Sequence, residues 1–129
     1  MRRSGLWHPR LAALVNDLRH TDAMVVADVG LPVPAHVETV DLAWARDEPA
    51  FLPVMAAVIR ELVVEQALLA EELTDPAVLD GVEACLPGVP VKRTGHDDLK
   101  ARCAAARVVV RTGETTPYAN VILTAGVPF

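Results

Sequence analysis

The chain has 129 residues, the length of one domain, which excludes a multidomain enzyme. Hydrophobic residues make up 52% of it, so the chain can close a core and is not intrinsically disordered. The formal charge is −5, no basic cluster is present, and aromatic residues are only 4%. These properties argue against nucleic acid as the main partner, because phosphates require a basic surface and single strands require aromatic stacking.

Neither an export signal nor a membrane span is evident. No apolar segment follows Arg2 and Arg3, so we expect no signal peptide and a cytoplasmic protein. No run of about 18 apolar residues occurs, so we expect no membrane span. Cys85 and Cys103 have no zinc or CxxC spacing, and two buried free thiols are expected. A mean hydropathy of +0.30 is high for a small domain, which predicts that other subunits cover some apolar surface.

Apolar periodicity divides the chain into alternating helices and strands. Leucines recur at helical spacing behind Pro9, a residue that suits a first helical turn. The run 23–27 is apolar on both faces, as in a buried parallel strand. The β-branched run 58–64 predicts a strand, and the Ala-, Leu- and Glu-rich run 65–73 predicts a helix. The expected helices are 8–19, 49–57, 65–73, 75–86 and 95–107. The expected strands are 23–27, 37–44, 58–64, 89–94, 108–111 and 121–124.

This alternation predicts an α/β fold: a single domain over residues 1–129, with three α/β/α layers and a mostly parallel central sheet. In such sheets, ligands bind beyond the carboxyl ends of the strands. Three polar clusters follow predicted strands, namely Asp28 with the loop 30–32, the segment 95–97, and the segment 113–120. The sequence therefore predicts one polar rim.

Histidine is the first candidate for acid/base chemistry, because only imidazole normally titrates near neutral pH. His8 and His36 are expected at the surface. His20 lies between the first helix and the first strand. There it could be a histidine stabilised by a helix C-terminus. Alternatively, it could be an acid/base whose tautomer is set by a nearby carboxylate such as Asp22.

Each polar residue of the rim has a structural and a binding interpretation. Asp28 could cap the following turn or accept hydrogen bonds from a polyol. His96 and Lys100 are four residues apart on a predicted helix, so they share a face, either as a solvated pair or as ligand contacts. Tyr118 and Asn120 flank one small residue in an extended segment, so both could point the same way. Tyr118 could equally pack in the core.

The common cofactor and nucleophile motifs are missing from the chain. There is no GxSxG, Walker A or GxGxxG sequence. Glu114 could bind substrate or stabilise its own loop. The histidines and aspartates lack recognised ligand spacing, so no metal is expected.

Two long segments resemble the D-ribose pyranase family. One runs from His20 to Pro34, and the other runs from Arg111 to Leu123 and continues through Val127. Between them, Val40–Ala43 and Thr94–His96 match in order, so the likeness spans nearly the whole chain. The related fucose mutarotases share a Gly-Glu-Thr…Tyr-x-Asn ending. The chain departs from the family pattern at Thr115, where a cysteine or small residue is expected.

The resemblance implies an enzyme of carbohydrate metabolism, an isomerase that interconverts the pyranose and furanose forms of D-ribose without a cofactor. It implies that His20 is the catalytic acid/base. It implies sugar contacts from Asp28, His96, Lys100, Tyr118, Ala119 and Asn120, and a homodecamer of two stacked pentameric rings. The alternatives are a mutarotase for fucose or another sugar, and a non-catalytic sugar-binding or transport-associated protein that would not need His20.

One geometric difficulty follows from these assignments. His20 precedes the strand 23–27 and Asp28 closes it, so at about 3.3 Å per residue their α-carbons could be roughly 20 Å or more apart. A single protomer could place both on one sugar only if the chain bent sharply before the strand. The ring-shaped assemblies of the family favour a site shared between subunits, with at least one of the named residues reaching a neighbour's pocket.

Overall fold

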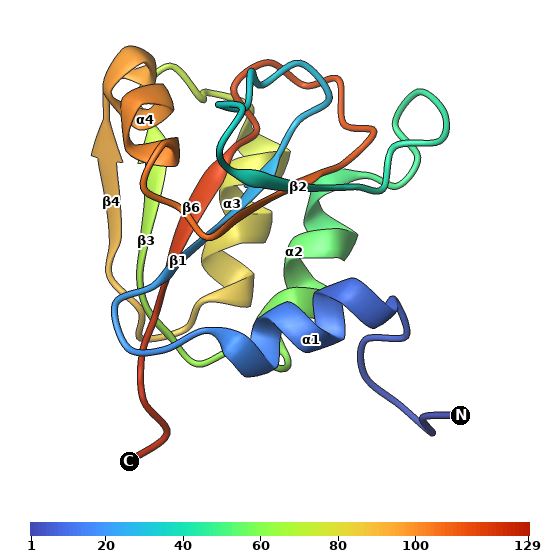
Figure 1. The fold of residues 1–129 in the computed structure, drawn as a ribbon. Coiled ribbons are helices and arrows are strands. Elements are labelled where there is room, and N and C mark those ends of the chain that lie inside the picture. The colour runs from blue at the N-terminus through green and yellow to red at the C-terminus, as the bar shows by residue number, and fades with distance from the viewer.

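A six-stranded sheet organises the computed structural model, which describes residues 1–129 (Figure 1). The elements in chain order are α1 (Pro9–Asp17), β1 (Ala23–Ala27), β2 (Glu38–Asp41), α2 (Phe51–Ile59), β3 (Val64–Ala70), α3 (Pro76–Cys85), β4 (Val91–Thr94), α4 (His96–Cys103), β5 (Val108–Arg111) and β6 (Val121–Ala125). The strand order is β2-β5-β1-β6-β3-β4. Only β6 runs antiparallel to its neighbours, β1 and β3, so the sheet is mostly parallel.

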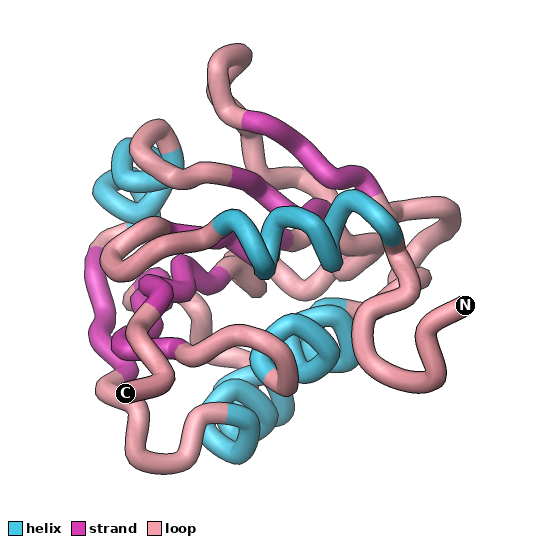
Figure 2. Tube along the Cα trace, turned by 60° about the horizontal axis from the view of Figure 1, so that its bottom comes forward, coloured by secondary structure: helices cyan, strands magenta, loops and turns pink.

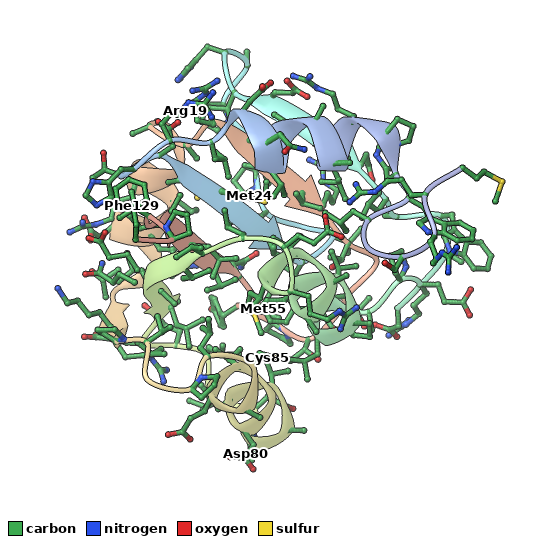
Figure 3. All side chains as sticks on the ribbon, turned by 90° about the horizontal axis from the view of Figure 1, so that it is seen from below. Arg19, Met24, Met55, Asp80, Cys85 and Phe129 are labelled. Carbon is green, nitrogen blue, oxygen red and sulfur yellow. The ribbon has the colours of Figure 1, made fainter.

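Helices cover both faces of the sheet, which confirms the predicted three layers. Side chains of α1, α2 and α3 join one core of 23 buried residues. Leu99 and Cys103 of α4 belong to a second core of 11 residues on the other face. Figure 1 shows α4 apart from the other three helices, and Figure 2 shows the strands lying between helices. In Figure 3, Met24 and Met55 lie inside the molecule, while Asp80 points outward from α3.

The central strands are buried on both faces, as their continuous apolar sequences predict. Met24 to Ala27 in β1 and Val108 to Val110 in β5 are all 0% exposed. Both strands have the predicted bounds. Side chains that are buried on both faces of the sheet are typical of a central parallel strand, which is the element predicted for both segments.

The predictions for 58–64 and 65–73 are wrong. Val58 is a buried residue of α2, and 64–70 is a strand rather than a helix. The segment contains good helix formers, but β3 lies between β6 and β4, where Ala67 to Ala70 are buried. Burial in the sheet outweighs an intrinsic helix preference of a few tenths of a kcal/mol per residue.

Two further expectations concern the cysteines and the membrane. Both cysteines are free thiols, but only Cys103 is fully buried, since Cys85 is half-buried. Burial raises the pKa of the Cys103 thiol to about 11. None of the helices has the length and apolar character needed to cross a membrane.

Candidate functional site

The predicted polar clusters meet at one edge of the sheet. A pocket of about 210 Å³ there is lined by Asp28, Gly30, Leu31, Pro32, His96 and Tyr118. These residues converge because β1, β4 and β5 run in the same direction and end at this edge, whereas the antiparallel β6 begins there. The structure thus brings together Asp28, His96 and Tyr118 of the predicted contacts.

Asp28 is oriented by Asn120. The backbone N–H of Asp28 donates to Asn120 Oδ1 at 2.9 Å, and Asn120 Nδ2 donates to Asp28 Oδ2 at 3.0 Å. Asp28 Oδ1 accepts the N–H of Gly30 at 2.9 Å, so Asp28 both caps its turn and faces the pocket. Asn120 and Ala119 are 0% exposed and do not line the pocket. Asn120 therefore supports the pocket from behind, while Ala119 packs in the core.

His96 and Tyr118 form an aromatic wall of the pocket. Their ring centroids are 4.9 Å apart and the rings meet edge to face at 75°. Tyr118 has a left-handed backbone with φ of +65°, a conformation that residues other than glycine rarely adopt. The Nδ1 atom of His96 is buried without a hydrogen-bond partner in the chain. An unpaired polar atom in a pocket wall is typical of a ligand site.

Lys100 is not part of this pocket. Its Nζ lies 2.9 Å from Asp97 Oδ1, an ion pair on the solvent side of α4. The hydrogen bond from Lys100 lowers the pKa of the Asp97 carboxyl. Within one chain, Lys100 therefore pairs with Asp97 rather than with His96 and does not line this pocket. Its contact with the sugar stays a prediction.

Glu72 is a rim residue that the sequence pattern did not single out. Its Oε2 accepts the backbone N–H of His96 at 2.8 Å, at the start of α4, where Gly95 offers no side-chain cap. This hydrogen bond is the main cause of the lowered pKa of Glu72. Glu72 follows β3 just as Asp28 follows β1, but the expected helix at 65–73 concealed that signal.

The loop that carries Tyr118 is fixed by two carboxylates. Glu114 Oε2 accepts the N–H of Phe51 at 2.9 Å, and its Oε1 accepts the N–H of Thr116 at 3.2 Å. Asp47 Oδ1 accepts both the N–H and the hydroxyl of Thr115, at 2.9 and 2.6 Å. Glu114 thus stabilises its loop and caps α2, which is the structural alternative expected for it.

His20 lies at the opposite edge of the sheet. Its Nε2 is 2.6 Å from Glu65 Oε2, and both side chains are about half exposed, at 52%. The prediction that Asp22 orients His20 is wrong. The Asp22 carboxylate instead accepts hydrogen bonds from the N–H of Arg19 and the guanidinium of Arg107. The whole of β1, roughly 17 Å long at about 3.3 Å per residue, lies between His20 and Asp28. A single chain therefore does not bring His20 to the pocket.

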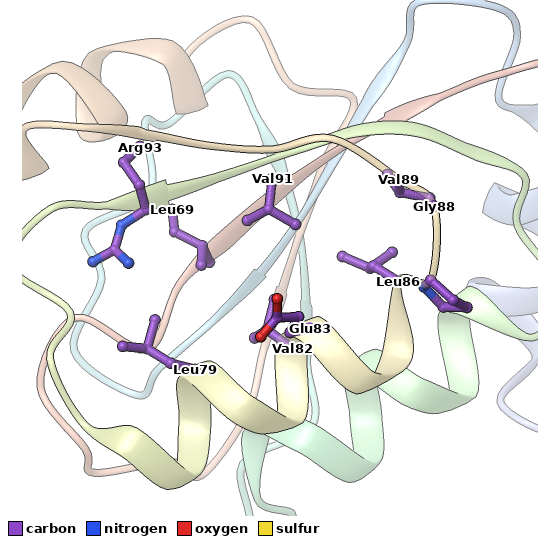
Figure 4. A pocket seen from close by; sticks show the side chains of 10 residues that line it. Leu69, Leu79, Val82, Glu83, Leu86, Gly88, Val89, Val91 and Arg93 are labelled. Atoms are coloured by element: carbon purple, nitrogen blue, oxygen red, sulfur yellow. The ribbon is translucent and has the colours of Figure 1, made fainter.

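The largest cavity lies between α3 and β4 and has a different character (Figure 4). It measures about 640 Å³, and its polar side chains are those of Glu83 and Arg93. The Arg93 guanidinium is occupied, since it donates to the backbone carbonyls of Ala70, Glu71 and Leu73. Neither cavity holds a group of three or more His, Cys, Asp or Glu placed for a metal ion. The smaller pocket at the strand ends is the candidate site.

Fold and rim together define an α/β protein with a candidate site for a small polar ligand at the strand ends. The model of the RbsD / FucU transport protein family matches residues 1–128. The chain belongs to this family. A D-ribose pyranase from Geobacillus thermodenitrificans is 44% identical over 100% of this chain and 99% of the relative.

Solved structures agree with this assignment. Bacillus subtilis RbsD complexed with D-ribose has a TM-score of 0.95 and 37% identity, covering 100% of both chains. The fucose mutarotase of Streptococcus pneumoniae in complex with L-fucose has a TM-score of 0.78 and covers 96% of this chain and 100% of that one. At 20% identity, the second likeness shows the fold alone.

Proposed function

We propose that the protein is a D-ribose pyranase, an isomerase that interconverts the pyranose and furanose forms of D-ribose. Identity of 44% to a named D-ribose pyranase and the match to a ribose-bound RbsD support the substrate. The observation that carries the proposal is the polar pocket of Asp28, His96 and Tyr118, whose volume is about 210 Å³. This volume suits a monosaccharide, whereas drug-sized ligands take about 300 Å³ or more.

The chemistry requires only proton transfer. In ring opening, a base removes the proton of the anomeric hydroxyl, the bond from C1 to the ring oxygen breaks, and the ring oxygen takes up a proton. The C4 hydroxyl then attacks the aldehyde carbon and loses its proton, while the carbonyl oxygen gains one, which gives the furanose. An imidazole can take and return each proton, and this is the role of His20 in the proposal.

His20 serves the pocket of a neighbouring protomer. Two observations support this arrangement. The first is that His20 and the pocket lie at opposite edges of the sheet. The second is that both edges carry exposed apolar residues. Val63, Val127 and Phe129 are exposed near the His20 edge, and Val29 and Tyr118 are exposed near the pocket. Exposed apolar side chains at both edges are suited to burial against another subunit.

A contact between two different edges of identical chains is heterologous, so it closes into a ring when the rotation allows. The proposed assembly is a homodecamer of two stacked pentameric rings in the cytoplasm, with sites at the subunit interfaces. Lys100, which faces solvent in the single chain, would become a sugar contact only in such an assembly.

Saturation-transfer NMR between the ring forms of D-ribose tests the proposed activity. The protein should accelerate exchange between pyranose and furanose, and the His20→Ala variant should return the rate to that of ribose in buffer. Fucose and galactose, measured in the same way, test the sugar. Ribose binding without faster exchange would contradict the enzyme and support a sugar-binding protein, and faster exchange of fucose than of ribose would contradict the substrate.

A further inference from the structure

We infer that Glu65 is a positioning residue for ring opening, one that fixes the tautomer and the orientation of the His20 imidazole. This inference rests on the proposed function, in which His20 is the acid/base. Glu65 does not line the pocket of its own chain, and its side chain contacts His20, so its proposed action is through His20.

The hydrogen bond determines which ring nitrogen is free. A carboxylate can only accept, so His20 Nε2 carries the proton that it donates to Glu65 Oε2 at 2.6 Å. In the neutral ring, Nδ1 then holds the lone pair. Nδ1 makes no hydrogen bond within the chain and lies on a half-exposed side chain. The base atom presented to a neighbouring site is therefore Nδ1.

A β-bulge places the Glu65 carboxylate. Strand β3 pairs Val64 with Ala125 and Gln66 with Thr124. Ala125 and Thr124 are adjacent in β6, so Glu65 is an extra residue in β3 that has no partner in β6. A bulge of this kind redirects a side chain and is common beside active sites. Glu65 is thus directed toward His20 by an irregularity in the sheet that a regular strand would not contain.

The backbone next to His20 is strained and held from several sides. Thr21, a β-branched residue, has a left-handed φ of +73°. Its N–H donates to the carbonyl of Ala125 at 2.9 Å, and the N–H of Ala125 donates to the carbonyl of Asp22 at 2.8 Å. The end of β6 therefore fixes the turn of His20 on one side and pairs with the bulge of Glu65 on the other. Strain that persists under such restraint is characteristic of functional sites.

In the reaction, Glu65 has one electrostatic role. When Nδ1 takes a proton from the anomeric hydroxyl, the ring becomes an imidazolium with both nitrogens protonated. The Glu65 carboxylate stabilises this cation and keeps the ring in place until Nδ1 returns the proton to the ring oxygen. The orienting carboxylate of a catalytic triad has the same role beside its histidine.

Substitution of Glu65, with exchange measured over a range of ribose concentrations, tests the inference. Glu65→Gln should lower kcat about tenfold or more with little change in KM, because only the proton-transfer step loses a partner. Glu65→Asp keeps the carboxylate and should recover part of kcat. Glu38→Gln is the matched control, since it breaks the exposed Arg10–Glu38 pair, also 2.6 Å long, away from His20. The control should keep full activity.

The double variant separates the inference from the proposed function. In a His20→Ala background, Glu65→Gln should have no further effect. If His20→Ala abolishes exchange but Glu65→Gln leaves kcat unchanged, the inference is wrong and the role of His20 stands. If His20→Ala retains exchange, the proposed role of His20 fails. Both single variants should unfold at the wild-type temperature, because exposed ion pairs contribute little to stability. A matching loss of stability in Glu65→Gln would indicate a structural role and overturn the inference.

Discussion

At the scale of single residues, the pocket depends on side chains that do not line it. Asp28 faces the pocket, but buried Asn120 fixes both its backbone and its carboxylate. Glu72 holds the first N–H of α4 and thereby His96. The aromatic contact with Tyr118 completes the wall. Asp28, His96 and Tyr118 thus each have a partner in the chain that restricts their motion, which lowers the entropic cost of binding a small sugar.

Asn120→Ala tests this support. The substitution leaves the N–H and a carboxylate oxygen of Asp28 without their partner, which should lower the free energy of unfolding by about 1–3 kcal/mol. Ribose affinity should fall as well, since Asp28 loses its orientation. Urea unfolding and ribose titration measure the two effects. Asn16→Ala, which removes an exposed hydrogen bond on α1, should change neither. Unchanged ribose affinity in Asn120→Ala would show that Asp28 does not need this support.

Cys103 allows a test of burial through its pKa. Because the pKa is raised to about 11 in the folded state, iodoacetamide at pH 9 should modify half-buried Cys85 and spare Cys103. The neutral buried thiol stabilises the fold fully below the ordinary thiol pKa, and that contribution is lost as pH rises toward 11. Mass spectrometry of peptides after alkylation measures the selectivity. Equal modification of both cysteines in the folded protein would contradict the burial of Cys103.

The residue types of the pocket could be predicted from the sequence, but their partners could not. Asp28 and Tyr118 follow strand-like runs, so their position at the rim could be predicted from the sequence. The contacts of Glu65 and Glu72 depend on β3, whose helix-forming composition concealed a strand. Glu65 also requires a bulge, and pairing irregularities leave no mark on a single sequence. Asp22 was the nearest carboxylate in sequence to His20, whereas the actual partner comes from 45 residues away.

At the scale of elements, the pocket loop 113–120 is joined to the projecting loop before α2. The N–H of Asp47 donates to the carbonyl of Gly113 at 2.7 Å, and the N–H of Gly113 donates to the carbonyl of Pro49 at 2.8 Å. Gly113 is buried against this loop. The two segments therefore stabilise each other, and the position of Tyr118 depends on residues far from it in sequence.

Gly113→Ala should separate these loops. A Cβ at this position would lie 2.6 Å from backbone atoms of Ala45 and Glu48, which cannot yield as a flexible side chain would. We expect a loss of about 1–3 kcal/mol in the free energy of unfolding, as for other overpacked sites. Gly95→Ala is the control, since a Cβ there meets nothing within 4 Å. Chemical denaturation of both variants is the measurement, and wild-type stability of Gly113→Ala would show that the loops are not closely packed.

At the scale of the whole molecule, the fold separates the two halves of the proposed site. The carboxyl ends of β1 and β4 and the start of antiparallel β6 place Asp28, His96 and Tyr118 at one edge, and the start of β1 places His20 at the other. The distance between His20 and the pocket could be predicted from the sequence, because the predicted strand 23–27 lies between His20 and Asp28. The closure of subunits into a ring and the number of subunits depend on the shapes of surfaces. The periodicity of apolar residues does not describe these shapes, so the sequence indicates the assembly only through family resemblance.

Complementation between two inactive variants tests the shared site most directly. His20→Ala and Tyr118→Ala protomers are co-expressed with different tags, and assemblies that contain both are purified and assayed for ribose exchange. If His20 and Tyr118 of different protomers form each site, random mixing restores about a quarter of the sites to wild type, and activity should return to about that fraction. Mixed assemblies as inactive as either variant alone would contradict a site built across two subunits.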